Sequence, residues 1–187
     1  LYALAMSRFS GAIVAIKIPT DLAEASATII VDPYREIIIP DMPVRPEDDI
    51  YIRRSATPLE QEAAKPLRLA RAQAFADAND INKVECDMPN ARLAIAAVGR
   101  SYGEVRETLG LLGIEDVAVV RVGMPWELSL RSSAIQYLLQ KPHVLVVEEK
   151  AGIVEQQINA LFYDQSPRPH LFGKDTPGPG SLPSTGV

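Results

Sequence analysis

Short apolar strands that alternate with amphipathic helices predict an α/β fold, with a Rossmann-like three-layer αβα domain around a mostly parallel sheet. The alternation is clearest between about residues 91 and 174. A second observation is that residues 1–31 predict only a strand–helix–strand remnant, which is too small to bury its own faces. A third is the repeated proline between these two parts, which predicts a linker that is first extended and then helical.

Composition supports a globular protein. The chain has 187 residues, a formal net charge of −5, 47% hydrophobic residues and 23% charged residues, which excludes disorder throughout. The mild acidity argues against general nucleic-acid binding, which needs a basic face. Because Cys86 is the single cysteine, this chain alone cannot form an intramolecular disulfide, a cysteine-held iron–sulfur cluster or a zinc knuckle.

The first residues predict the end of a helix, Leu1 to Phe9, which Gly11 closes. Ala12 to Ile18 is a nearly continuous apolar run, typical of a strand that is buried on both faces of a parallel sheet. Arg8 and Lys17 interrupt this region, so neither a signal peptide nor a membrane span is expected.

A short helix and a short strand are expected next. Asp21 and Glu24 have the spacing of a capping box, and Thr28 to Val31 is a strand-like run. Since the chain opens inside a structured element, we expect it to be an internal piece of a longer protein.

The middle of the chain predicts the linker. Prolines make Asp32 to Asp49 an extended connector, and residues 57–60 (TPLE) are a strong helix start with a hydroxyl N-cap, Pro at N1 and Glu at N3. Pro66 is expected to kink or split this helix, and Asn79 or Asn82 to end it. Its charged residues are expected to form a solvated face: Glu60, Glu62, Arg68, Arg71 and Asp77.

The third segment predicts the αβα domain in full. Expected strands are residues 91–98, 117–122, 143–147 and 169–173, and expected helices are residues 101–112, 132–140 and 152–163. Ser101 and Glu104 have capping-box spacing, and Gly113 ends the first of these helices. Residues 176–187 consist mainly of Thr, Pro, Gly and Ser, which predicts a flexible tail. The predicted divisions are therefore residues 1–31, 32–89, 90–175 and 176–187.

Ligands of an open parallel sheet bind beyond the carboxyl ends of its strands, and three places there qualify. Gly99, Arg100 and Ser101 follow a strand and open a helix, so they are candidates for binding an anionic part of a cofactor; the alternative is a plain turn and cap. Trp126 follows the next strand. We expect it to pack against a neighbouring domain; the alternative is that it lines a pocket and contacts a substrate. Glu148, beside a second glutamate, is either a functional acid in a pocket or a solvated strand end.

Other reactive groups do not combine into a site. His143 and His170 lack metal-ligand spacing, and Cys86 has no nearby histidine to activate it. The sequence contains neither a G-x-S-x-G elbow nor a G-x-x-x-x-G-K phosphate loop. We therefore predict no catalytic residue and no metal site in this chain.

The order of these pieces resembles a known family, the indolepyruvate ferredoxin oxidoreductases, in their bacterial fused form. The resemblance extends from about Tyr2 to Asp175 and rests on four stretches: residues 7–32, 45–79, 91–129 and 143–163. The PLEQE run, and the GRSY turn with VVEEK downstream, are fairly specific in combination.

This resemblance implies a parent enzyme that oxidatively decarboxylates aryl 2-oxoacids to acyl-CoA, with ferredoxin as electron acceptor. It implies thiamine diphosphate, magnesium, iron–sulfur clusters and coenzyme A as cofactors of that parent. Residues 1–31 would be the end of the pyrimidine-binding domain, and residues 90–175 a transketolase C-terminal-like domain. The G-D-G mark of the pyrophosphate-binding domain is absent, so we expect this chain to hold no cofactor itself.

Two hypotheses about function follow. In the first, the chain is a non-catalytic portion of the oxidoreductase that serves domain assembly. Its partners would be the remaining domains, ferredoxin would be a partner of the parent, and the protein would be a cytoplasmic homo-oligomer that binds neither nucleic acid nor membrane. In the second, it is a free-standing Rossmann-like binding module, since fold does not determine function.

Overall fold

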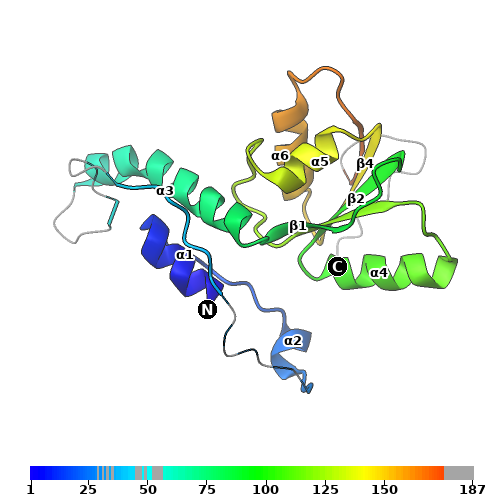
Figure 1. The fold of residues 1–187 in the computed structure, drawn as a ribbon, viewed down its shortest axis with the longest axis horizontal. Helices are drawn as coiled ribbons and strands as arrows, with labels where there is room; N and C mark the ends of the chain where they lie inside the picture. The colour runs from blue at the N-terminus through cyan, green and yellow to red at the C-terminus, as the bar shows by residue number, and fades with distance from the viewer. Residues whose placement is uncertain are drawn as a thin grey trace. The chain divides into compact units, whose positions relative to one another are not determined.

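A computed structural model describes residues 1–28, 30, 32, 34, 36–44, 48, 50–51 and 57–174. The chain divides into two compact units, an N-terminal unit (Leu1–Asn79) and a C-terminal unit (Asp80–Val187), which are taken in turn (Figure 1). The N-terminal unit contains three helices in its described part: α1 (Tyr2–Ser10), α2 (Thr20–Glu24) and α3 (Pro58–Ala78).

Helix α1 packs on α3 through a buried arginine. The Arg71 guanidinium lies 4.0 Å from the centre of the Phe9 ring and donates two hydrogen bonds, of 2.7 and 2.9 Å, to the Phe9 carbonyl. A third N–H of Arg71 donates to the Met42 carbonyl, and Arg68 donates to the Ile50 carbonyl. The expectation of a solvated charged face is therefore wrong for Arg68 and Arg71, because both side chains are buried and bind backbone carbonyls of α1 and of non-helical chain.

Helix α3 begins as predicted and continues past its proline. Thr57 accepts a hydrogen bond from the Glu60 N–H, and the Glu60 carboxylate accepts one from the Thr57 N–H, which completes the capping box. The helix runs unbroken through Pro66 to the C-cap Asn79, so the proline does not split it. In the part of the chain that the structure describes, no helix is both long and apolar enough to cross a membrane.

The expected strand over residues 12–18 is wrong, since these residues form no strand. A strand needs a neighbour to satisfy its backbone, and the described part of the N-terminal unit contains no other strand with which to pair. Thr28 and Ile30 are not in a strand either, while Ile29 and Val31 lie outside the described residues. The expected capping box at the second helix also fails, because Pro19 is the N-cap and no side chain caps α2.

The C-terminal unit is built on a five-stranded sheet with the order β1-β3-β2-β4-β5. Strands β2, β3, β4 and β5 pair in parallel, and β1 pairs with β3 in the antiparallel sense. This mostly parallel α/β arrangement confirms the predicted fold class. The strands are β1 (Asn82–Cys86), β2 (Leu93–Val98), β3 (Ala118–Val122), β4 (His143–Val147) and β5 (His170–Phe172), and the helices are α4 (Ser101–Leu112), α5 (Ser133–Leu139) and α6 (Ile153–Phe162).

Helices cover both faces of this sheet, as Figure 1 shows for α5 and α6 on one side and α4 on the other. The register places Ala96 of β2 beside Val120 of β3 and Val146 of β4, so these three residues face the same layer. Their core cluster includes Ile135 of α5, Ile158 of α6 and further buried residues of both helices. Strand residues of the opposite parity, Ile95, Ala97 and Val119, form a second cluster with Val105 of α4.

Strand β1 falls inside the predicted linker and was not expected. It forms the antiparallel edge of the sheet, with an irregular register between Val84 and Cys86. Its sequence, NKVEC, contains one residue with a strong strand preference, Val84, so its position depends on β3.

Candidate functional site at the carboxyl edge of the sheet

The loops that follow β2, β3 and β4 meet at the carboxyl edge of the sheet, where the sequence places every candidate site residue. Parallel strands end at the same edge, and a backbone hydrogen bond of 3.0 Å from Gly99 N–H to the Val122 carbonyl joins the ends of β2 and β3. The ends of β2 and β4 are linked by Arg100 and Glu149, whose charged groups lie 3.8 Å apart.

Backbone hydrogen bonds hold the turn at Gly99, Arg100 and Ser101, and one of its own N–H groups, that of Gly99, donates to the Val122 carbonyl. Tyr102 N–H donates to the Gly99 carbonyl, and Gly103 N–H donates to the Arg100 carbonyl. Gly99 adopts a positive φ of 54°, and Ser101 is buried at the start of α4. The expected capping box is not formed, because Arg100 is the N-cap and no side chain caps the helix. Anion binding at this turn and the alternative of a plain turn both stay predictions.

Arg100 faces carboxylates from two elements. Its Nε lies 3.1 Å from Glu104 in α4 and 3.8 Å from Glu149 after β4. These exposed pairs each contribute little to stability, but they offset the positive charge that an anion would need. The side chain therefore ties two loops of the edge together.

Glu148 is a buried helix anchor. Its side chain is 8% exposed, and its two carboxylate oxygens accept hydrogen bonds of 2.9 Å from the N–H groups of Val154 and Glu155. These N–H groups belong to the first turn of α6, where a negative charge also complements the helix dipole. The interpretation of a solvated strand end is wrong for Glu148, and both oxygens are engaged within the fold.

Trp126 lies on the loop after β3 with 63% of its surface exposed. Buried Asn82 holds one end of this loop, since its side chain accepts the Met124 N–H at 2.8 Å and donates to the Met124 carbonyl. Gln157 of α6 holds the other side, because it donates to the Pro125 carbonyl at 2.8 Å and accepts the Leu128 N–H at 3.0 Å. The loop thus presents an exposed indole from a backbone tied down on both sides.

Sequence reasoning did not identify the two amides as loop supports. The sequence places Gln157 only within an expected helix and Asn82 only at a possible helix end. Nothing local links Asn82 or Gln157 to loop residues that lie 42 and 32 positions away, respectively. The paired amide-to-backbone geometry becomes visible only once β1 and α6 flank the loop.

The exit of β5 is also fixed by a buried carboxylate. Glu155 accepts the Lys174 N–H at 2.7 Å, and Lys174 Nζ donates to the Lys150 carbonyl at 2.6 Å. A β-carbon on Gly173 would collide with the Glu155 carboxylate, so a larger residue here requires that carboxylate or the chain to shift. These contacts bring the end of β5 to the start of α6.

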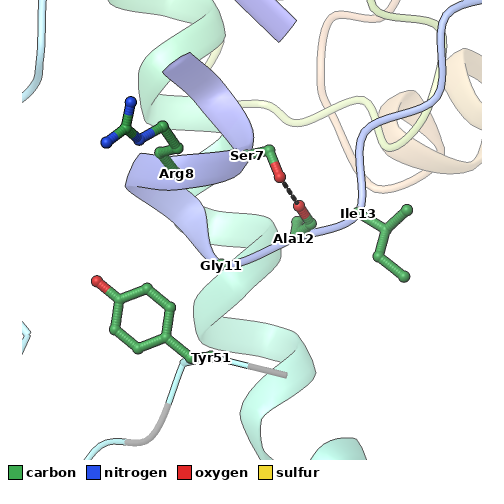
Figure 2. Close-up of a pocket in the computed structure, with 6 residues that line it drawn as sticks. All are labelled: Ser7, Arg8, Gly11, Ala12, Ile13 and Tyr51. Carbon is green, nitrogen blue, oxygen red and sulfur yellow. Dashed lines mark hydrogen bonds between the residues drawn. The ribbon is translucent and has the colours of Figure 1, made fainter. Parts of the chain in front are cut away.

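The N-terminal unit has a shallow cavity of about 410 Å³, and none of the candidate residues described above lines it. Figure 2 shows the Ser7 hydroxyl donating to the Ala12 carbonyl, at 2.7 Å, with the Arg8 and Tyr51 side chains beside the opening. The lining residues are Ser7, Arg8, Gly11, Ala12, Ile13 and Tyr51.

The described residues do not fit the iron–sulfur clusters or the metal ion that the resemblance implies for the parent. Iron–sulfur clusters need several cysteine ligands, and the sequence has Cys86 alone. Among the described residues, no three His, Cys, Asp or Glu side chains lie together as a metal site would require. No chemical step is therefore assigned to these groups in this chain.

Comparison with known proteins identifies the family. Residues 83–182, more than half of the chain, match the family model described as "Indolepyruvate oxidoreductase domain". The chain is similar to proteins named "Indolepyruvate oxidoreductase subunit IorA" from Thermococcus kodakarensis, at 35% identity over 86 residues, and from Pyrococcus abyssi, at 34% over 88 residues. The same named subunit from Pyrococcus horikoshii is 33% identical over 91 residues. Each match covers 46% of this chain but 13% of the relative's length. The chain therefore belongs to the indolepyruvate oxidoreductase family.

Proposed function

We propose that this chain is a non-catalytic portion of an indolepyruvate ferredoxin oxidoreductase and serves domain assembly there. The single observation that carries the proposal is that the polar side chains at the carboxyl edge bind other groups of the same unit. Glu148 caps α6, Arg100 faces two carboxylates, and Asn82 and Gln157 hold a loop. Trp126 is left as the exposed feature of that loop, and exposed aromatic residues are frequent anchors of protein contacts.

The proposal places the chemistry elsewhere in the parent. That parent would oxidatively decarboxylate an aryl 2-oxoacid to acyl-CoA and reduce ferredoxin, in the cytoplasm, with thiamine diphosphate, magnesium, iron–sulfur clusters and coenzyme A held by its other parts. The partners of this chain would be those parts, in a homo-oligomeric enzyme. Each match covers 13% of the relative's length, which supports the placement of the cofactors and the chemistry in other parts of the parent.

Two measurements test the proposal. Immunodetection in source cells should find these residues in a polypeptide several times heavier than 20.4 kDa, whereas a native product near 20.4 kDa would favour a free-standing module. The purified chain, given indolepyruvate, coenzyme A and oxidised ferredoxin, should form no acyl-CoA. Protein-dependent acyl-CoA formation would overturn the non-catalytic assignment.

A variant pair tests the role of Trp126 in the intact parent. Trp126→Ala should weaken the association of the parts and make the parent more sensitive to limited proteolysis. Tyr163→Ala, at an aromatic residue that is 71% exposed on the same unit, is the matched control and should leave both unchanged. Equal behaviour of the two variants would remove Trp126 from the assembly surface.

A further inference from the structure

We infer that the C-terminal unit carries a second binding site, for a small carboxylate with an apolar body, between the last turns of α6 and the start of β5. A cavity of about 330 Å³ lies there, away from the carboxyl edge. Its described lining combines one arginine, one histidine and one amide with apolar residues: Asn159, Phe162, Arg168, Pro169, His170 and Leu171.

The rim of this cavity offers hydrogen-bond donors. Arg168, His170 and Asn159 are all exposed, and within the described residues no hydrogen bond or ion pair engages the side chain of Arg168 or Asn159. A guanidinium presents its N–H groups in a planar fork that matches a carboxylate. Arg100 at the carboxyl edge differs, because two carboxylates already face it. Arg168 is thus the better placed of the two arginines to receive an anion.

The floor of the cavity is apolar. Phe162 and Leu171 are buried members of the core cluster, and Pro169 is buried beside them. A floor of this kind favours an apolar group over water, while the polar rim sets the orientation of the ligand. The combination selects a carboxylate that carries a hydrocarbon or aromatic body, in preference to a bare inorganic anion.

The backbone of the rim and the His170 ring are restrained before a ligand arrives. Pro167 and Pro169 flank Arg168 and restrict the backbone on both sides of it. The His170 ring stacks on Phe172, with centroids 4.5 Å apart and planes inclined by 25°, and its backbone N–H donates to the Pro142 carbonyl at 2.9 Å. Such preorganisation reduces the entropy that binding would cost.

Two electrostatic effects on a bound anion oppose each other at the cavity. The carboxyl end of α6 carries partial negative charge, which opposes an anion. Two of its last carbonyls, of Ala160 and Phe162, already accept hydrogen bonds from the N–H groups of Tyr163 and Gln165. No acidic residue is found among the described lining residues, and Arg168 supplies a formal positive charge to the rim.

The test uses the full 187-residue chain and 3-phenylpropionate as the probe, with NMR chemical shifts followed during titration. We expect a Kd on the order of 1 mM and shift changes confined to Asn159, Phe162 and residues 168–171. Arg168→Gln should weaken binding about tenfold or more, because a charge-assisted pair is lost. Arg131→Gln, at another exposed arginine of the same unit, is the matched control and should bind as the original chain does.

Two comparison ligands define the chemistry. 3-Phenylpropan-1-amine, which replaces the anion by a cation, and inorganic phosphate, which lacks the apolar body, should each bind at least tenfold more weakly. Equal binding of the amine, an unchanged Kd in Arg168→Gln, or shift changes elsewhere would overturn the site. Circular dichroism of each variant confirms that the fold is intact, and His170→Gln provides a second variant of the rim if Arg168→Gln fails to fold. The result is independent of the proposed assembly function, since neither the parent enzyme nor its activity enters the measurement.

Discussion

Glu148 and Val154 are joined by a hydrogen bond of 2.9 Å between a buried carboxylate at the end of β4 and a backbone N–H in the first turn of α6. The second carboxylate oxygen accepts the N–H of Glu155 in the same turn. One side chain therefore couples the end of a central strand to the start of a helix that covers the sheet.

Removing this anchor should destabilise the C-terminal unit. Glu148→Ala should lower its free energy of unfolding by about 2 kcal/mol, because hydrogen bonds to a charged acceptor are lost and two N–H groups are left without a protein partner. Urea denaturation followed by far-ultraviolet circular dichroism measures the change. Glu149→Ala, at the exposed neighbour, should change it by less than about 0.5 kcal/mol. Equal losses would show that Glu148 is not the anchor.

The loop that bears Trp126 should loosen when its side-chain support is removed. Gln157→Met keeps the length of the side chain but cannot accept the Leu128 N–H or donate to the Pro125 carbonyl. Hydrogen exchange at Leu128 should become about tenfold faster, while exchange in the central strands stays slow. Gln140→Met, at an exposed position after α5, is the control; acceleration in both variants would contradict a specific role of Gln157.

Replacing Gly173 should destabilise the C-terminal unit. The β-carbon of Gly173→Ala would meet the buried Glu155 carboxylate, which also accepts the Lys174 N–H, so either this hydrogen bond is disturbed or the exit of β5 moves. We expect a loss of about 1–3 kcal/mol in thermal or urea unfolding. Gly103→Ala in α4 is the opposite case, since the space around that position is open, and it should stabilise the unit by about 0.5–1 kcal/mol. A neutral Gly173→Ala would refute the close packing at this point.

The start of α3 should weaken in acid. Hydrogen bonds from the backbone and side chain of Thr57 hold the pKa of Glu60 below its ordinary value of 4.5. Because the folded pKa is the lower one, the stabilisation is complete above about pH 4.5 and is lost as the pH falls through the folded pKa. Protection factors of the first-turn N–H groups, which correct for the intrinsic pH dependence of exchange, should fall as the pH falls through that range in the original chain and in Glu62→Gln, but lose this dependence in Glu60→Gln. An unchanged profile in Glu60→Gln would exclude the capping box as its cause.

Much of the C-terminal unit could be predicted because its signals are local. Apolar runs at the spacing of buried strands, and glycine after Leu112, place β2 to β5 and α4 to α6 within a few residues of their observed bounds. Strand β1 was not predicted, because its residues form a strand only by pairing with β3. Its antiparallel pairing is a long-range contact that periodicity does not reveal.

The sequence predicted where the candidate residues lie in the fold, but not which groups their side chains contact. The rule that ligands bind beyond parallel strands led to Arg100, Trp126 and Glu148, which do lie at that edge. That Glu148 is buried depends on where α6 begins relative to β4, and that Arg68 and Arg71 are buried depends on how α1 and nearby chain pack on α3. A charged residue in a sequence does not show which backbone groups will surround it.

The sequence by itself determined the fold class, the order of most helices and strands in the C-terminal unit, and the family resemblance that residues 83–182 confirm. These depend on periodicity, capping residues and motif order, all of which act between near neighbours in the chain. Tertiary structure alone decided that residues 12–18 form no strand, that β1 closes one edge of the sheet, and that Glu148 serves α6. The physical reason is that strand pairing and the burial of charge are settled by partners far apart in sequence, whose positions exist only after the chain has folded.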